Sequence, residues 1–259
     1  MGSDISGRHL ARLSGLDEAS SRPTGEAGGT RGYPAGLWRL PGVAPCRDGS
    51  VSDMKIGILT DIHEAASDLR KALAVLRQHG ADRLVFLGDV CGMHTDLEET
   101  VRLLDEADVV GVWGNHDFGL CGGNPTDEDR LHYSDRLLAY MGRLRPRLEV
   151  EGCLLTHVEP WLDPETIEDL WFFDGPPESP ERVARIFAAA PNRVMFVGHY
   201  HRWMLVTPEG MQPWSGDGPI VLEAGGRYLV CVAAVCQGGC ALFDTVTGLL
   251  TPFDVGRTG

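Results

Sequence analysis

The chain has no long apolar run, little lysine and no repeated cysteine spacing. No stretch approaches the roughly 20 apolar residues that a membrane-spanning helix needs, which excludes a helical membrane span. Residues 1–30 contain no apolar segment typical of a secretory signal, so we expect a cytoplasmic protein. Lysine supplies only two of the 23 basic residues, which we attribute to genomic base composition rather than to function.

The seven cysteines form no recognisable disulfide framework, because their number is odd and no pair spacing recurs. We therefore predict free thiols in a reducing compartment. A metal cluster at Cys231, Cys236 and Cys240 is not favoured, because their spacing matches none of the common zinc-binding patterns.

The negative charge lies in the second part of the chain. The net charge is −14, and residues 1–53 hold equal numbers of acidic and basic side chains, so the excess lies in 54–259. A strongly acidic domain without a basic stripe repels nucleic acid, which makes a nuclease or nonspecific nucleic-acid binder a minor alternative. A small phosphate substrate is compatible with this charge only if bound cations reverse it locally.

Two segments are predicted, a leader over 1–53 and a domain over 54–259. The leader holds ten of the 33 glycines and no sustained periodicity, which indicates disorder. An alternative is that translation begins at Met54, directly before an apolar strand. The oligomeric state is not predicted by any feature of the sequence.

The domain begins with alternating strands and helices. One helix is predicted with an apolar face at Leu69, Leu73 and Leu76 and an end at His79–Gly80. Another should follow a capping box over 95–98. Strand–helix–strand units of this kind predict parallel strands.

Later segments have other patterns. A third helix is expected over roughly 126–145, and an insertion over 158–190 contains two proline-started helices, at Asp163–Pro164 and Ser179–Pro180. From 203 onward, short strands with glycine turns predict a second, largely antiparallel sheet packed on the first.

Five polar clusters each follow an apolar run of strand length. The runs read IGIL, RLVFL, VVGVW, CLL and RVMFV. Residues just beyond buried strands lie at the carboxyl edge of a sheet, where α/β folds build their sites. We therefore expect the clusters to meet at one such edge; they are Asp61–His63, Gly88–Asp89, Gly114–Asp117, Thr156–His157 and Gly198–His201.

These residue types suit a pair of divalent cations. Two adjacent cations need a bridging anion, for which Asp89 is the candidate, while Asn115 offers a neutral oxygen beside histidines. Mixed oxygen and imidazole ligands favour Mn, Fe, Co, Ni or Zn over Ca or Mg, and we expect Mn. His116 is a candidate catalytic acid, with Asp117 a candidate to fix its tautomer, although adjacency alone leaves that contact open.

Taken together, the clusters resemble the signature of the calcineurin-like metallophosphoesterase superfamily: DxH, GDxx, GNHD or GNHE, a lone His and GHxH. The match covers about 54–253 and is similar to the small single-domain bacterial and archaeal branch, which hydrolyses phosphodiesters and dinucleoside polyphosphates. The resemblance implies a four-layer αββα sandwich of two mixed sheets flanked by helices. It also implies a metal-bridging hydroxide that attacks phosphorus in line.

The resemblance further implies a role for each cluster residue. Asp61, His63 and His201 would bind one metal, and Asp89 would bridge it to the other. The second metal would be bound by Asn115, His157 and His199, and His116 would be the catalytic acid.

Two departures bear on the substrate. Protein phosphatases of this superfamily carry Asp-Arg-Gly after the Gly-Asp block, whereas this chain continues with Val90–His94 and no arginine. The late Asn-Pro-Gly-Ser-like turn is replaced by Cys231–Val235. We therefore expect a small phosphodiester or nucleotide-type substrate, with a phosphomonoesterase (including a protein phosphatase) as the alternative and a catalytically silent scaffold as the non-enzymatic one.

Six further residues lie near these clusters in the sequence, and each allows two interpretations. His94 and Arg202 either contact a substrate phosphate or lie on the surface. Four aromatic residues of the insertion form either an aromatic wall for a nucleobase or ordinary core and dimer contacts, the latter being favoured; they are Trp161, Trp171, Phe172 and Phe173.

Overall fold

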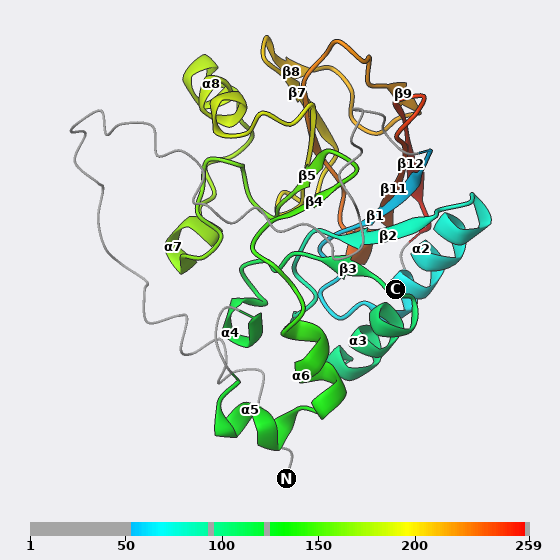
Figure 1. The fold of residues 1–259 in the computed structure, drawn as a ribbon, viewed down its shortest axis with the longest axis vertical. Coiled ribbons are helices and arrows are strands. Elements are labelled where there is room, and N and C mark those ends of the chain that lie inside the picture. The colour runs from blue at the N-terminus through cyan, green and yellow to red at the C-terminus, as the bar shows by residue number, and fades with distance from the viewer. Residues whose placement is uncertain (1–52, 93–95, 122–124, 257–259) are drawn as a thin grey trace, which may run out of the picture.

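The computed structural model describes residues 53–92, 96–121 and 125–256, which form two six-stranded sheets (Figure 1). The first sheet has the order β3 (Val110–Gly111), β2 (Arg83–Phe86), β1 (Lys55–Leu59), β11 (Gly239–Asp244), β12 (Leu249–Asp254) and β9 (Ile220–Val221). The second has the order β4 (Leu148–Val150), β5 (Cys153–Leu155), β6 (Val194–Val197), β10 (Tyr228–Cys231), β7 (Met204–Thr207) and β8 (Gly210–Gln212).

Both sheets are mixed, which confirms that part of the prediction. β1, β2 and β3 are mutually parallel, as are β5, β6 and β10, and the other pairings are antiparallel. The expected division of strands was wrong, however, because the strands after 203 do not make the second sheet by themselves. β11 returns to pair with the free edge of β1, where unpaired backbone groups need partners, so each sheet combines early and late strands.

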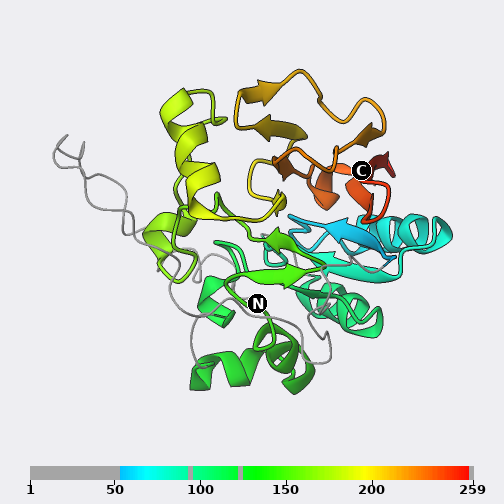
Figure 2. The same cartoon turned by 45° about the horizontal axis from the view of Figure 1, so that its top comes forward.

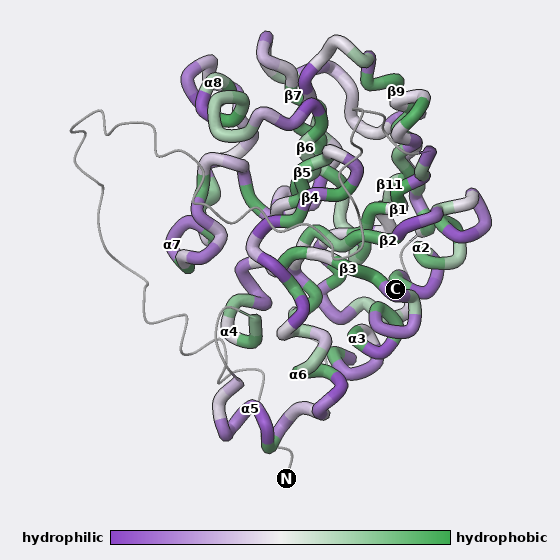
Figure 3. Tube along the Cα trace, in the orientation of Figure 1, coloured by the Kyte–Doolittle hydropathy of each residue, from purple (hydrophilic) through white to green (hydrophobic). Residues whose placement is uncertain are grey.

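Alternate residues of each strand face different cores, which produces the four layers. Ile56 and Ile58 of β1 lie between the sheets with Phe196 of β6, while Leu59 faces a separate core under the helices. Met195 of β6 faces a third core on the outer side of the second sheet. Figure 3 shows the same division as hydrophobic strands among more hydrophilic helices. These three cores confirm the αββα sandwich.

Helices cover the outer face of each sheet (Figure 2). α2 (Ala66–Gln78) and α3 (Leu97–Glu106) share the core of the first sheet, and α6 (Asp135–Met141) packs on α3. α8 (Pro180–Ala189) shares the core of the second sheet. A short 3-10 helix, η2 (Val235–Gln237), lies between β10 and β11.

Two of the expected helices are confirmed. In α2 the side chains of Leu69, Leu73 and Leu76 are buried, and the helix ends at His79 as predicted. α8 begins at Pro180, and the Ser179 hydroxyl accepts a hydrogen bond from Arg182 N, which satisfies one of the free amides of the first turn.

Other helices differ from the prediction. The single helix over 126–145 is replaced by α5 (Asp127–His132) and α6, preceded by α4 (Phe118–Cys121), because Ser134 caps a new helix after an extended Tyr133. α7 (Ile167–Leu170) begins after Thr166, so Pro164 lies in a turn rather than at a helix start.

The predicted capping box also differs. Thr95 lies outside the described residues, and the N-cap of α3 is Asp96, whose side chain makes no capping hydrogen bond. The Glu98 carboxylate instead accepts hydrogen bonds from Ser134 N and Oγ.

Some predictions fall outside the described residues or are tested only in part. The leader over 1–53 lies outside them apart from Asp53. Six cysteines are described and all are free, as expected. No helix in the described ranges is long and apolar enough to cross a bilayer.

Candidate metal centre

The five polar clusters converge where the two sheets meet, rather than at the edge of one sheet. Three follow β1, β2 and β3 of the first sheet, and two follow β5 and β6 of the second. The expected single edge was therefore wrong, because β5 and β6 pair with β10 instead of extending the first sheet. The site consists of loops that face one another across the sandwich.

Left-handed backbone conformations aim the side chains of these loops. Asp61, His63, Asp89, His199 and His201 have φ of 49°, 45°, 66°, 68° and 53°. Non-glycine residues in this region cost about 1–3 kcal/mol each, so the surroundings must hold them in place. These bends bring Asp61 and His63 together in one group and direct His201 to that group and His199 to Asn115, as expected for kinked loops.

Backbone hydrogen bonds and two glycines hold the strained loops. Asp61 N donates to Gly88 O over 2.9 Å, and His63 N donates to Asp89 O over 3.0 Å. A Cβ at Gly114 would overlap Asp89 Oδ1. One at Gly198 would lie 2.7 Å from Asp61 Oδ2. Glycine is therefore required where these turns approach the carboxylates.

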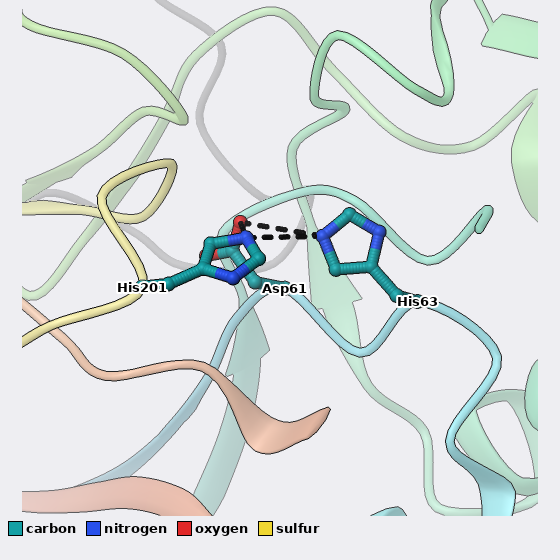
Figure 4. A group of neighbouring side chains, drawn as sticks. All are labelled: Asp61, His63 and His201. Atoms are coloured by element: carbon teal, nitrogen blue, oxygen red, sulfur yellow. Dashed lines mark hydrogen bonds and ion pairs between the residues drawn. The ribbon is translucent and has the colours of Figure 1, made fainter. Parts of the chain in front are cut away.

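The first ligand group contains Asp61, His63 and His201 (Figure 4). His201 Nε2 lies 3.1 Å from Asp61 Oδ1 and 3.1 Å from His63 Nε2. The buried Asp61 carboxylate accepts hydrogen bonds at Oδ2 from Thr60 Oγ1 and His199 N. Its Oδ1 makes no hydrogen bond of acceptable geometry within the described residues, which suits a cation ligand.

The second group contains Asn115, His157 and His199. Asn115 Oδ1 lies 3.0 Å from His157 Nε2 and 3.1 Å from His199 Nδ1. Asp89 lies between the two groups, because its Oδ2 is 3.3 Å from His157 Nε2 and 3.7 Å from His63 Nε2. Asp89 is thus placed where a carboxylate could bridge two cations.

Backbone carbonyls fix the tautomers of three histidines. The ring nitrogens that face Cys91 O, Leu87 O and Phe172 O must donate, because a carbonyl only accepts; they are His63 Nδ1, His157 Nδ1 and His199 Nε2. In the neutral rings the opposite nitrogens then present lone pairs toward carboxylate and amide oxygens. Lone pairs that face one another are favourable only with a cation between them, so the donor set fits divalent metals.

The pKa values of the candidate ligands also indicate a site that favours positive charge. Burial alone lowers the pKa of His157, but the Asp89 carboxylate outweighs burial and raises it to about 9. The Asp61 carboxylate, whose Oδ1 lies 3.1 Å from His201 Nε2, is the main reason why the pKa of His201 rises to about 10. Burial works to raise the pKa of Asp89, yet His157 and its neighbours hold it below its usual range. In the metal-free chain, protons on imidazoles therefore offset the carboxylates.

His116 lies beside His63 of the first ligand group and beside Asp89. Its backbone amide donates to Asp89 Oδ1 over 3.0 Å, and its ring centroid is 4.9 Å from that of His63. With His63 and Asp89 it also forms a candidate ligand group. Burial lowers the pKa of His116. A half-buried imidazole at this place can exchange a proton with a group bound between the loops.

Asp117 serves the loops rather than the His116 ring. Its carboxylate accepts hydrogen bonds from four backbone amides, those of Asp89, Val90, Cys91 and Gly114. Within the described residues, none of its hydrogen bonds goes to His116. The pairing of Asp117 with His116 stays a prediction, and these contacts instead favour a role in joining two ligand loops.

The sequence reasoning missed a buried network beside the site. The buried Glu159 carboxylate accepts hydrogen bonds from Arg182, Tyr200 and Trp161. This network joins the 158–190 insertion to the loop that holds His199 and His201. The clue in the sequence was proximity to the candidate ligands, since Glu159 follows His157 by two residues and Tyr200 lies between His199 and His201.

The aromatic residues of the insertion divide into two kinds. Trp161 and Phe172 pack against the core. The side chains of Trp171 and Phe173 remain 42% and 57% exposed and lie beside His116 and His199. The favoured expectation of core packing thus holds for two of the four.

The two other candidate phosphate contacts have different outcomes. His94 lies outside the described residues. Arg202 is exposed and lines, with His201, a cavity of about 720 Å³.

Known proteins share this sequence pattern and architecture. The chain is 25% identical over 200 residues to the uncharacterized protein MJ0912 of Methanocaldococcus jannaschii, covering 70% of this chain and 76% of the relative. A crystal structure of a metallophosphoesterase from Sphaerobacter thermophilus superposes with a TM-score of 0.64 at 24% identity, over 80% of this chain and 90% of that one. A predicted diadenosine tetraphosphatase has a TM-score of 0.55 at 17% identity, over 86% and 99% of the two chains.

A family model describes most of the same segment. The calcineurin-like phosphoesterase superfamily domain matches residues 54–225, and these include all five polar clusters. The strands after 225 complete both sheets. Sequence, fold and site agree, and the chain therefore belongs to the calcineurin-like phosphoesterase superfamily.

Proposed function

We propose that this chain is a two-metal phosphoesterase that hydrolyses a phosphodiester or a nucleotide-type phosphoanhydride. The observation that carries the proposal is the position of Asp89, whose Oδ2 lies within 4 Å of a histidine nitrogen from each ligand group. Family membership supports a phosphoester hydrolase. A carboxylate between two imidazole groups is the arrangement that a pair of cations requires.

Seven residues would hold the two ions. Asp61, His63 and His201 would bind one, Asn115, His157 and His199 the other, and Asp89 both. The mixture of nitrogen and oxygen donors favours Mn, Fe, Co, Ni or Zn, and we propose Mn. When bound, the ions supply Lewis-acid chemistry that offsets charge on the phosphoryl oxygens.

The chain's own groups would orient the ester and move a proton. Loop amides and glycine turns keep the ligands rigid, so the substrate phosphate meets a preformed site. As the bond between phosphorus and the leaving oxygen breaks, a proton on the His116 ring passes to that oxygen. Burial lowers the pKa of His116, which makes its protonated form a stronger acid.

The proposal favours a small diester over a phosphoprotein. No arginine follows Asp89 through Gly92, where the protein phosphatases of the superfamily carry one. The monoester reaction is the alternative outcome of the test below.

The test compares bis-p-nitrophenyl phosphate with p-nitrophenyl phosphate in added Mn, using wild type and Asp89→Asn. We expect hydrolysis of the diester, its loss in Asp89→Asn and lower metal content by mass spectrometry. Asp108→Asn is the matched control, because Asp108 also has a positive φ but is exposed away from the site. Hydrolysis of the monoester alone would favour a phosphatase, and no hydrolysis with Mn, Ni, Co or Zn would favour a scaffold.

A further inference from the structure

Two exposed aromatic rings lie on the side of the metal centre formed by the insertion. We call Trp171 and Phe173 the aromatic wall. The ring centroid of Trp171 is 5.1 Å from that of His116, and that of Phe173 is 5.7 Å from that of His199. Large aromatic side chains gain most when buried, so two exposed rings beside one site indicate a surface that is covered when a ligand binds.

The backbone beneath the wall is held on both sides. Phe172 O accepts a hydrogen bond from His199 Nε2, and Trp171 N donates to Ile167 O. Arg182 Nη1 donates to Asp174 O over 2.7 Å, just beyond the wall. The rings therefore project from a braced segment, which lowers the entropic cost of binding against them.

Arg182 itself is braced from below. Its guanidinium hydrogen-bonds the buried Glu159 carboxylate and lies over the Phe172 ring, 5.4 Å from the centroid. Phe172 therefore points inward, while its neighbours on both sides point outward. This alternation explains why the insertion presents Trp171 and Phe173 to solvent without unfolding.

We propose that Trp171 stacks against a nucleobase in the leaving group, so that the substrate is a nucleotide-type ester; this inference rests on the proposed function. In the proposed reaction the leaving group is the one that receives a proton from His116, so it must lie next to the His116 ring. Trp171 contacts that ring and is therefore on the leaving-group side of the site. Every nucleobase has a face that stacks on indole. Stacking also provides affinity without positive charge, which suits a chain of net charge −14.

A second place for a base lies beside His201. The cavity of about 720 Å³ beside His201 is also lined by Trp203 and Trp214, whose ring centroids are 5.7 Å apart. The residues that line this cavity include neither His116 nor Trp171. Trp214 is therefore the matched control for Trp171, being a partly exposed tryptophan that lines the cavity beside His201.

The experiment measures binding of two ligands to the full-length, Mn-loaded protein by calorimetry. Adenosine 5′-monophosphate and ribose 5-phosphate carry the same phosphate ester and differ by the base. Wild type should bind the nucleotide about tenfold or more tightly than the sugar phosphate, as stacking on one ring provides. Trp171→Leu should remove most of this preference, Trp171→Phe should keep part of it, and Trp214→Leu should keep all of it.

Several results would overturn the inference. Equal weakening of both ligands in Trp171→Leu would mean that the indole only positions His116. Loss of the preference in Trp214→Leu would place the base in the cavity beside His201. If light scattering shows a dimer for wild type and a monomer for Trp171→Leu, the aromatic wall is a contact surface between two copies of the chain.

The proposed function can fail separately. If wild type hydrolyses the diester but shows no preference for the base, the stacking inference alone is wrong. If it binds neither ligand and hydrolyses no ester, the phosphoesterase proposal fails and the inference falls with it. Metal content and thermal unfolding of each variant show whether its site is intact.

Discussion

The two sheets contribute different chemistry to the candidate metal centre. The first sheet supplies every oxygen donor, namely Asp61, Asp89 and Asn115, together with His63. The second supplies only imidazoles, those of His157, His199 and His201. All negative charge of the ligand set thus comes from the first sheet, while the second sheet contributes imidazoles alone. We therefore expect the carboxylates of the first sheet to attract the cations and the imidazoles of the second sheet to fix their positions.

The two sides are also braced differently. The first-sheet loops hold one another, since Asp117 accepts four of their backbone amides. The second-sheet loops depend on the insertion through Glu159, Arg182 and Tyr200. Direct links between the sides include the hydrogen bonds from His199 N to Asp61 Oδ2 and from His157 Nδ1 to Leu87 O. Variants that weaken one side at a time test whether this division is real.

The largest effect should come from removing charge on the first side. Asp61→Asn replaces a buried anionic ligand, whereas His199→Gln replaces a neutral one. We expect diesterase kcat/KM to fall on the order of 1000-fold for Asp61→Asn, several kcal/mol of lost stabilisation, and less for His199→Gln. In a metal titration, Asp61→Asn should likewise lose more metal affinity than His199→Gln. A greater loss of affinity in His199→Gln would contradict the division of charge.

The next largest effect should come from breaking the contact between Arg182 and Glu159, which supports the second-sheet loops and should lower the stability of the fold. Arg182→Met leaves the buried Glu159 charge without its partner, which costs about 3–5 kcal/mol of unfolding free energy. Adding Glu159→Gln should restore part of the loss, because the buried charge is then absent. Urea unfolding of the single and double variants checks this coupling, and additive losses would argue against it.

The corresponding test for the first-sheet loops removes the hydrogen bonds that their backbone amides donate to Asp117. Asp117→Asn keeps the shape of the side chain but leaves only one oxygen for four buried amides. We expect a loss of roughly 3 kcal/mol in the free energy of unfolding, since each unsatisfied buried amide costs about 1–3 kcal/mol. Asp108→Asn is the control, with no change expected at its exposed position. An equally stable Asp117→Asn would show that the amides find other acceptors.

The smallest effect concerns pH. Because the pKa of His157 is about 9 and that of His201 about 10, both hold protons at pH 7 in the metal-free chain. A cation must displace them, so metal affinity should rise from pH 7 to 9, with proton release visible by calorimetry in buffers of different ionisation heat. Both pKa values are raised, so their contribution to metal-free stability is full below about pH 6.5 and is lost as the pH rises through 9 to 10. Unchanged affinity across this range would contradict these protonation states.

Local sequence signals predicted the parts of the site well. Each polar cluster does follow a strand, and the left-handed residues Asp61 and His199 supply the loop bends that the sequence predicted. Helix ends at His79 and Ser179 were predicted because capping and glycine preferences act within one turn. The single helix predicted over 126–145 was wrong, because Ser134 caps a second helix within that range.

The sequence by itself determined the residue types at the centre, the strands that precede them and the family. These depend on neighbours along the chain, where spacing and side-chain chemistry are explicit. Only the tertiary structure decided that the clusters come from two sheets, that Asp117 serves backbone amides and that Glu159 braces the imidazole side. Those features depend on pairings between distant segments, such as β11 with β1, that minimise exposed backbone and apolar surface for the whole chain.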